Sequence, residues 1–349
     1  FNFATQKVNE MWNKNINLLN EMITKGDKIA LIGHFNPDGD SVGSTTGFYN
    51  FLQQCSKDST IIYPSGVPQF LRFLLPEQNV LEYPQDNEKI VNCINDSDLI
   101  VCLDFNAFSR TENLKHLLAQ SKAKKILIDH HINPDINSFN LVFSDTEVSS
   151  TCELLYKILT SMPQIGGDAD KLSFATGQSL YVGMMTDTNN YSNSVFPFTL
   201  EMASQLLSKG VDKDAIQNKV FGAYSVDRMR LMGYLLYENM VYLPEYNAAF
   251  MTLSLEDQKR FNYQKGDNEG FVNLALSIKG VTISAFFTES EEFIRVSLRS
   301  KGDISVNIFS GAFFNGGGHK NAAGGKLFIP FNEVPDYFKN AIKEFKKDN

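Results

Sequence analysis

Acidic and imidazole side chains gather in three stretches of the first half of the chain, and no lysine or arginine lies in the first of them, LIGHFNPDGDSVGS (31–44). The side chains concerned are His34, Asp38 and Asp40 in that stretch, Asp104 in DLIVCLDF (98–105), and Asp129, His130 and His131 in KKILIDHH (124–131). Converging carboxylates repel one another, so they either take up protons or bind a cation. This composition therefore predicts a divalent metal site.

Imidazole and carboxylate ligands without a thiolate suit Mn²⁺ or Mg²⁺, with Fe²⁺, Co²⁺ and Zn²⁺ less favoured. The stretches offer more ligands than one ion needs. Two ions roughly 3.5 to 4 Å apart, bridged by one carboxylate, form a clamp for attack of water on phosphorus. Gly39 allows a tight turn between Asp38 and Asp40, and Ser41 is placed to begin a helix whose N-terminus could face an anion.

Each motif also has a simpler interpretation. The Asp-Gly-Asp turn could be a solvated loop, Asp104 could cap the helix that follows it, and the glycine cluster FFNGGGHKNAAGG could be a flexible hairpin. Histidine placement favours the functional interpretation, because four of the five histidines lie in these motifs and only His116 lies in an ordinary helical segment.

Elements of alternating type must position these residues. KIALIGH (28–34), STIIYP (59–64), DLIVCLDF and KKILIDHH are short apolar runs, with helical patterns between or after them. Such alternation predicts a parallel sheet covered by helices on both faces. Ligands bind at the carboxyl ends of the strands in such sheets, so the acidic and imidazole side chains are expected to converge at one edge.

At 349 residues, the chain is long enough for two domains. We predict an α/β architecture with a parallel-sheet first domain over 1–199, a helical linker over 200–242, and a smaller mixed α/β domain over 243–349. The net charge of −8 argues against a broad basic face for long duplex nucleic acid. No apolar run reaches the roughly 18 residues of a membrane helix, and four cysteines without a C-x-x-C pair fit a reducing cytoplasm.

Five motifs in order carry a resemblance to a known family: HFNPDGDSVGS, LDFNAFSR, IDHHIN, MMTDTNNYS and GGGHKNAAGG. They resemble the DHH phosphoesterases with a C-terminal DHHA1 domain, and among these the group of oligoribonucleases and 3'-phosphoadenosine 5'-phosphate phosphatases. The resemblance runs from about residue 20 to 340. It implies that the first domain is the catalytic DHH domain and that the last is the substrate-binding DHHA1 domain.

The resemblance also implies a site. One manganese ion would be held by His34, Asp38 and Asp104, and a second by Asp40, Asp104, His130 and Asp187, with Asp104 as the bridge. His131 is expected to face the scissile phosphate, and Asp129 to orient its neighbours. Substrate contacts are implied for Arg299 and Ser300 of SLRS and for Gly317, Gly318 and His319 of GGGH. An arginine fork and glycine amides are suited to phosphate, although a strand arginine alone is usually a surface residue.

We therefore expect a manganese-dependent phosphoesterase that acts on short oligonucleotides, linear dinucleotides or 3'-phosphoadenosine 5'-phosphate. Alternatives are an exopolyphosphatase or pyrophosphatase with the same metal core, and a nucleotide sensor without turnover. A processive RecJ-type exonuclease would need a basic channel and further domains, which the charge and length do not supply. The preferred substrate and the oligomeric state, with a homodimer as one candidate, are left open.

Overall fold

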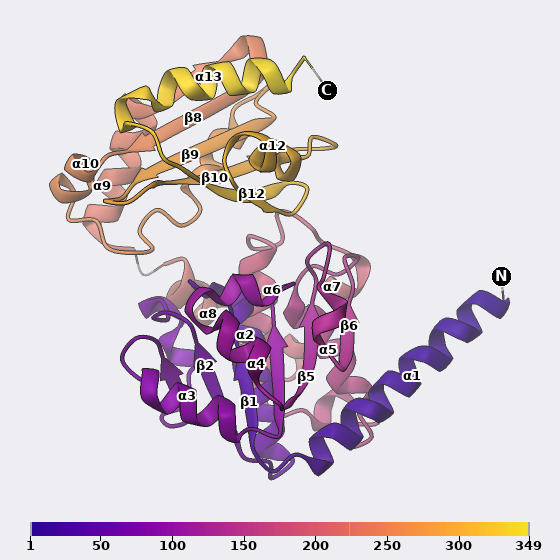
Figure 1. Ribbon diagram of the computed structural model, residues 1–349. Helices are drawn as coiled ribbons and strands as arrows, with labels where there is room; N and C mark the ends of the chain where they lie inside the picture. Colours follow the sequence, from indigo (N-terminus) through magenta and orange to yellow (C-terminus); the bar gives the residue numbers. More distant parts are fainter. Residues whose placement is uncertain (1, 223, 348–349) are drawn as a thin grey trace. The chain divides into compact units, whose positions relative to one another are not determined.

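The computed structural model describes residues 2–222 and 224–347. The chain divides into two compact units, 1–222 and 223–349, and each has its own sheet (Figure 1). Each unit also has its own hydrophobic core. The division falls inside the stretch 200–242 for which the sequence suggests a helical linker.

A six-stranded, all-parallel sheet forms the centre of the first unit, with strand order β3-β2-β1-β4-β5-β6. The strands are β1 (Ile29–Ile32), β2 (Ser59–Tyr63), β3 (Val80–Glu82), β4 (Leu99–Leu103), β5 (Lys124–Asp129) and β6 (Leu141–Ser144). The four central strands are the four apolar runs of the sequence, and their side chains are almost all buried, as expected for a sheet covered on both faces. The predicted parallel sheet is confirmed.

Helices cover both faces of this sheet. They are α1 (Asn2–Lys25), α2 (Gly39–Gln54), α3 (Asn87–Asp96), α4 (Lys115–Gln120), α5 (Thr151–Ser161), α6 (Phe174–Asp187), α7 (Pro197–Ser208) and α8 (Lys213–Val220), with short 3-10 helices at Gln69–Leu74, Phe108–Leu114, Ile136–Ser138 and Ala169–Lys171. One core joins the sheet to α1, α2, α5 and α6, and a second core joins its other face to α3 and α4. The carboxyl ends of the strands remain as the edge where side chains converge.

The second unit is a mixed sheet of order β11-β12-β10-β9-β8-β7, antiparallel except for the parallel pair β8 and β9. Its strands are β7 (Val241–Leu243), β8 (Ala248–Leu253), β9 (Ile283–Glu289), β10 (Ile294–Ser300), β11 (Gly317–Gly318) and β12 (Ala322–Leu327). The glycine cluster thus forms a hairpin of β11 and β12 at the edge of this sheet. The predicted smaller mixed α/β part is confirmed.

Helices also pack on both faces of the second sheet. They are α9 (Val226–Tyr234), α10 (Leu255–Arg260), α11 (Phe271–Leu274), α12 (Val306–Phe313) and α13 (Val334–Phe345), with a π-helical turn at Leu235–Asn239 and 3-10 helices at Pro244–Tyr246, Ala275–Ser277 and Phe331–Glu333. The phenylalanine-rich main core joins one face to α12 and α13. A smaller cluster joins the other face to α9 and α11.

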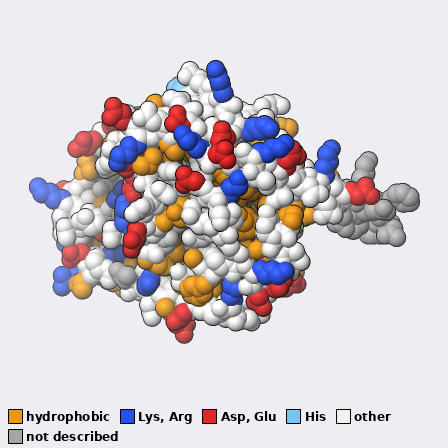
Figure 2. Space-filling model, turned by 90° about the horizontal axis from the view of Figure 1, so that it is seen from below, with side chains coloured by type: hydrophobic (Ala, Val, Ile, Leu, Met, Phe, Trp, Pro, Cys, Tyr) orange, Lys and Arg blue, Asp and Glu red, His pale blue; other side chains and the backbone are white. Residues whose placement is uncertain are grey.

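Surface charge, helix hydropathy and the state of the cysteines relate to where the protein is expected to act. On the face drawn in Figure 2, acidic and basic side chains are interspersed over the described residues rather than separated into areas of one sign. Of the helices in the described ranges, none has both the length and the hydropathy that a membrane span requires. Cys55, Cys93, Cys102 and Cys152 are all free thiols.

Candidate metal centre

The first two acidic residues of the site are held by the N-terminus of α2. Asp38 is the N-cap of this helix, and its Oδ1 accepts hydrogen bonds from the backbone amides of Asp40 and Ser41, each at 3.1 Å. Aspartate is a preferred N-cap residue because its side chain satisfies amides that lack a partner in the helix. Ser41 Oγ in turn accepts a hydrogen bond from the amide of His34, which follows β1. The turn therefore fixes His34, Asp38 and Asp40 relative to the sheet.

Asp104 follows β4 and is 2% exposed. Its φ is +67°, in the left-handed region where aspartate and asparagine are among the tolerated residues and where strained residues of active sites are often found. The backbone amide of Asp104 donates to the carbonyl of Ile128 on the neighbouring strand at 3.1 Å. The residue that sequence analysis places as a metal bridge thus has a constrained backbone and a buried carboxylate.

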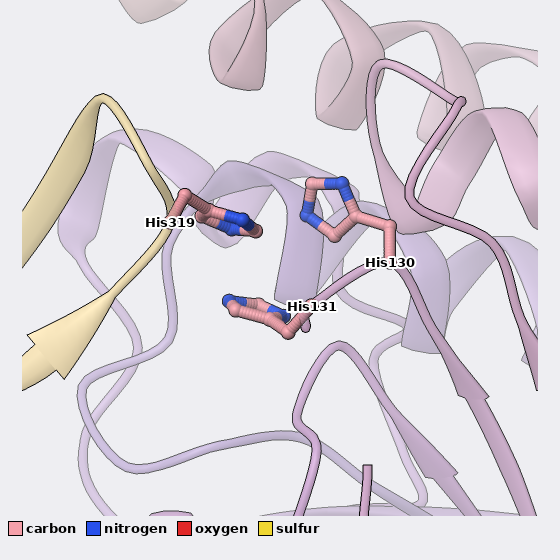
Figure 3. A group of neighbouring side chains, drawn as sticks. All are labelled: His130, His131 and His319. Atoms are coloured by element: carbon pink, nitrogen blue, oxygen red, sulfur yellow. The ribbon is translucent and has the colours of Figure 1, made fainter. Parts of the chain in front are cut away.

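Strand β5 ends at Asp129 and delivers two consecutive imidazoles. The Nδ1 atom of His131 lies 2.7 Å from Oδ1 of Asp129, which is fully buried. The rings of His130 and His131 have centroids 5.0 Å apart and an interplanar angle of 77°, so that they present their nitrogens in different directions (Figure 3). The two histidines are therefore suited to different roles.

These side chains converge on Asp104. His34 Nε2 lies 3.5 Å from Asp104 Oδ2 and 3.7 Å from Asp38 Oδ1. His130 Nε2 lies 3.7 Å from Asp104 Oδ1 and 3.8 Å from Asp40 Oδ2. The side chains form two groups in which all potential ligand atoms lie within 4.8 Å of one another. One group is His34, Asp38 and Asp104, and the other is Asp40, Asp104 and His130, so Asp104 belongs to both.

Asp187 is the last residue of α6, and its Oδ2 lies 3.5 Å from Nε2 of His130. Its sequence context, GMMTDTNNYS, resembles an ordinary helix end, so only the family resemblance pointed to it. The structure brings Asp187 to the same edge as the residues that follow β1, β4 and β5. A further combination of Asp104 with Asp129 and His131 also has metal-ligand spacing.

The N-terminus of α5 supplies hydrogen bonds that sequence analysis missed. The amides of Thr151 and Cys152 donate to Oδ2 and Oδ1 of Asp40 at 2.7 and 2.9 Å, and Thr151 Oγ1 donates to Asp104 Oδ1 at 2.9 Å. Ser150 caps this helix by accepting from the amide of Glu153. The Ser-x-x-Glu pattern in SSTCE was the available signal, because it predicts a helix start at this edge of the sheet.

The electrostatics of the site fit a cation. Burial, reinforced by the charge of Asp187, raises the pKa of Asp40 to about 6, and burial together with the charge of Asp40 raises the pKa of Asp104 well above its usual range. Burial alone would lower the pKa of His34, but Asp104 and Asp38 outweigh it and raise the pKa to about 10. The carboxylates repel one another, and a divalent cation would remove this repulsion.

The pair formed by Asp129 and His131 differs from the other groups. Burial tends to raise the pKa of Asp129, but the hydrogen bond from His131 outweighs it and the pKa is lowered. Burial lowers the pKa of His131 despite its carboxylate partner. The contact between Asp129 Oδ1 and His131 Nδ1 fixes the orientation of this imidazole ring next to a carboxylate.

The predicted substrate residues lie close together in the second unit. Arg299 and Ser300 end β10, Gly317 and Gly318 form β11, and His319 follows. Arg299 pairs with Ala322 of β12, to whose carbonyl the amide of His319 donates at 2.7 Å. The φ of Gly318 is +149°, and a Cβ there would lie 2.5 Å from a backbone oxygen, so this position requires glycine. The Gly318 amide donates to Asn307 Oδ1 at 2.7 Å.

An α/β sheet whose carboxyl edge carries overlapping groups of carboxylate and imidazole side chains forms a candidate divalent-metal site, of the kind that metal-dependent hydrolases use. Residues 28–184 match the N-terminal domain of the DHH family, and residues 246–347 match the DHHA1 domain. The chain therefore belongs to the DHH family of phosphoesterases, as its motifs predict, and is a hydrolase.

Individual relatives agree with this assignment. The chain is 28% identical over 307 residues to the bifunctional oligoribonuclease and PAP phosphatase NrnA of Bacillus subtilis, which covers 86% of this chain and 90% of that protein. It is 26% identical to the cyclic-di-AMP phosphodiesterase GdpP of Bacillus subtilis, over 94% of this chain but 49% of that longer protein. Among solved structures, the chain is similar to the crystal structure of an exopolyphosphatase-related protein from Bacteroides fragilis, with 39% sequence identity and a TM-score of 0.89. The match covers 96% of this chain and 97% of that chain.

Proposed function

We propose that the chain is a manganese-dependent phosphoesterase that hydrolyses short oligonucleotides, including linear dinucleotides, and 3'-phosphoadenosine 5'-phosphate. The observation that carries the proposal is the position of Asp104, which belongs to both groups of potential ligands. The name of the Bacillus subtilis relative that aligns over nearly its whole length supports the substrate class. Four free thiols are compatible with action in a reducing compartment such as the cytoplasm.

In this proposal, the ligands of one ion are His34, Asp38 and Asp104, and those of the other are Asp40, Asp104, His130 and Asp187. Oxygen and nitrogen donors without sulfur suit Mn²⁺, and Mg²⁺ or another divalent ion remains an alternative. Cys152 donates through its backbone amide to Asp40, and its thiol is not needed as a ligand. Bound ions would polarise the phosphoryl oxygens and lower the pKa of a water molecule.

His131 has a separate role in this proposal. Because Asp129 Oδ1 lies 2.7 Å from its Nδ1, the orientation of the His131 ring is fixed. We assign it to a hydrogen bond with an oxygen of the scissile phosphate, where negative charge develops during attack. A donor fixed in advance in this way stabilises the transition state more than the bound substrate.

The second unit supplies substrate contacts in this proposal. Arg299 and His319 are assigned to phosphate groups of the substrate, with Ser300 and Gly317 beside them. Ser300 Oγ donates to the carbonyl of Ile304 at 2.6 Å and accepts from Asn321, so it shapes the segment after β10. The amide of Gly318 is already bonded to Asn307, and we assign Gly318 to the shape of the turn rather than to phosphate binding.

A substrate panel tests the proposal. Purified protein with Mn²⁺ is given a dinucleotide, a five-nucleotide RNA, 3'-phosphoadenosine 5'-phosphate and inorganic polyphosphate, and released products are measured. We expect hydrolysis of one or more of the nucleotide substrates. Turnover of polyphosphate alone would instead favour the exopolyphosphatase alternative, to which the description of the Bacteroides fragilis relative points. Binding of nucleotides without any product would favour a sensor.

Asp104→Asn is the matched variant for the panel. Alanine at a φ of +67° would add backbone strain to the loss of the carboxylate, whereas asparagine tolerates this region. We expect Asp104→Asn to lose at least about a hundredfold in kcat, the scale of an essential group in the site, while keeping its fold by circular dichroism. Activity close to that of the parent protein would contradict the bridging role.

A further inference from the structure

One face of the strand pair β10 and β12 in the second unit differs from the rest of this sheet. The side chains of Ile294, Val296 and Leu298 are buried in the main core against α12 and α13. Because side chains alternate along a strand, Phe293, Arg295, Ser297 and Arg299 belong to the opposite face. Arg295 is exposed, and Ser297 and Arg299 are half-buried.

The register of β12 extends this face sideways. Arg295 pairs with Lys326, Ser297 with Gly324, and Arg299 with Ala322. Gly324 is exposed and leaves backbone open beside Ser297, so a ligand can approach the sheet closely there.

Two aromatic rings lie at the far end of the same face. The rings of Phe293 and Phe328 have centroids 6.3 Å apart, and Nζ of Lys326 lies 4.7 Å from the centroid of Phe293. Phe328 is 68% exposed, although a large apolar ring normally avoids water. We call Phe293, Arg295, Ser297, Arg299, Gly324, Lys326 and Phe328 the strand face.

Positive charge is concentrated here despite the overall charge of −8. Like charges directly opposite each other across a sheet destabilise it, and Arg295 and Lys326 form such a pair. Lys265 lies close enough to Arg295 for the two charges to interact, because burial and then the charge of Arg295 lower the pKa of Lys265. Asp267 and Glu269 of the same segment act together with Arg295 on Tyr263 and offset part of the positive charge. Glu291 and Glu292, both exposed, lie in the turn before Phe293 and limit the positive area at that end.

We propose that the strand face binds the part of an oligonucleotide substrate that lies beyond the nucleotides next to the scissile bond. The inference rests on the proposed function and adds to it a preference for strands longer than a dinucleotide. Single-stranded nucleic acids bind to faces that combine aromatic rings, on which bases stack, with cations that contact phosphates. From Phe293 to Arg299 the face is about 20 Å long, at about 3.3 Å per residue.

The position of Arg299 is the reason for choosing a substrate strand as the occupant. Arg299 is already assigned to a substrate phosphate, and it ends the same row of side chains that Phe293 begins. A strand held at Arg299 can therefore follow β10 to Arg295 and Lys326 and place a base on Phe328. A dinucleotide or 3'-phosphoadenosine 5'-phosphate is too short to reach from Arg299 to that ring.

The test compares two substrates on three variants of the full-length protein. The variants are Phe328→Ala, the double variant Arg295→Ala with Lys326→Ala, and Lys343→Ala as a control from α13, which packs on the other side of the sheet. We expect the first two to lower kcat/KM for a five-nucleotide RNA about tenfold, mainly through KM, and to change kcat/KM for a dinucleotide at most about twofold. In the double variant, kcat/KM for the five-nucleotide RNA should also depend less steeply on salt concentration than in the parent protein. The control variant should leave kcat/KM unchanged for both substrates.

The outcomes separate this inference from the proposed function. If the parent protein hydrolyses no oligonucleotide, the proposed function fails first. If it hydrolyses both substrates and the variants leave the longer RNA unaffected, only the strand-face inference is overturned. An equal loss on both substrates would also overturn it, as would a change of oligomeric state in sedimentation with unchanged kinetics, since the face would then join copies of the chain.

Discussion

Asp104 shows how one residue of this protein meets several demands. Its backbone lies in the left-handed region and its carboxylate is buried. Oδ1 lies near the hydroxyl of Thr151 and the imidazole of His130, and Oδ2 lies near the imidazole of His34. Residues in such conformations persist only where the surrounding structure holds them, which is common at functional sites. The strand order explains the central position of Asp104, because β4 lies between β1 and β5 and Asp104 therefore lies between the side chains that follow those two strands.

Thr151 contacts the carboxylate of Asp104 through a side-chain hydrogen bond. Its hydroxyl donates to Asp104 and leaves the remaining lone pairs of the carboxylate for a cation. We predict that Thr151→Val, which keeps the shape but removes the donor, weakens Mn²⁺ binding about tenfold, the low end of the range for groups that orient metal ligands. Calorimetric titration of the metal-free protein with Mn²⁺ measures this directly and does not depend on turnover.

Two variants serve as controls for Thr151→Val. Thr151→Ser retains a hydroxyl and should recover most of the affinity. Thr160→Val removes a hydroxyl from the other end of α5, where Thr160 Oγ1 donates to the carbonyls of Tyr156 and Lys157 in its own helix, and should leave Mn²⁺ binding unchanged. If Thr151→Val binds Mn²⁺ like the parent protein, the hydrogen bond to Asp104 does not position a ligand.

The residues of the site differ in how far sequence could predict them. His34, Asp38, Asp40, Asp104 and His130 follow apolar runs, and the geometry of parallel strands explains why they meet. Asp187 ends a helix rather than a strand, so no strand pattern indicated it. The Thr151 contact depends on where α5 begins in space, which the Ser-x-x-Glu pattern marks along the chain but does not locate in the fold.

Close packing between α2 and α6 positions the site at the scale of elements. A Cβ on Gly43 of α2 would lie 2.6 Å from the carbonyl oxygen of Ser179 and 2.9 Å from the amide nitrogen of Gly183, both in α6. These are backbone atoms, which cannot move aside without displacing the helix. Asp40 lies one turn before Gly43 in α2, so any displacement would move this carboxylate as well.

We predict that Gly43→Ala destabilises the protein by about 1 to 3 kcal/mol, the usual cost of overpacking, and also weakens Mn²⁺ binding. Gly233→Ala is the matched control, because Gly233 lies in helix α9 and a Cβ there would meet nothing within 4 Å. That substitution should stabilise the protein by about 0.5 to 1 kcal/mol. Denaturant unfolding measures both values, and a neutral Gly43→Ala would contradict the close-packing argument.

The central strands of the first sheet are continuous apolar runs and can be predicted from the sequence, whereas the two edge strands cannot. The apolar runs of β1, β2, β4 and β5 are each bounded by polar residues, and they were recognised as strands of a parallel sheet. β3 is only half-buried, and β6 alternates between buried and more exposed residues, whereas the equally short β1 is buried throughout, so neither β3 nor β6 shows the continuous apolar run of a central parallel strand. Gly317 and Gly318 form β11 because β12 pairs with them, which is a tertiary effect.

At the scale of the whole molecule, two units with separate cores carry two kinds of residue. The first contains the carboxylates and imidazoles of the candidate metal centre, and the second contains Arg299, the glycine hairpin and His319. If the first unit performs the reaction and the second binds the substrate, variants in the two units should differ in their kinetic effects and not only in their size.

His131 and His319 test this division of roles, because one histidine comes from each unit. His131 is assigned to the reacting phosphate, so His131→Ala should lower kcat by about two to three orders of magnitude, the scale of one transition-state donor. His319 is assigned to a phosphate of the bound nucleotide, so His319→Ala should act chiefly on KM for a dinucleotide, with a smaller loss in kcat where phosphate placement also aligns the attack.

A second substrate makes the contrast sharper. A chromogenic phosphodiester without a second nucleotide offers few groups for the second unit to bind, so it should respond strongly to the loss of His131 and weakly to the loss of His319. The ratio of the two effects on each substrate, taken from kcat and KM of the same preparations, is the measurement. If His319→Ala lowers kcat equally on both substrates and leaves KM unchanged, His319 acts on the reacting atoms, and the assignment of binding to one unit and chemistry to the other is wrong.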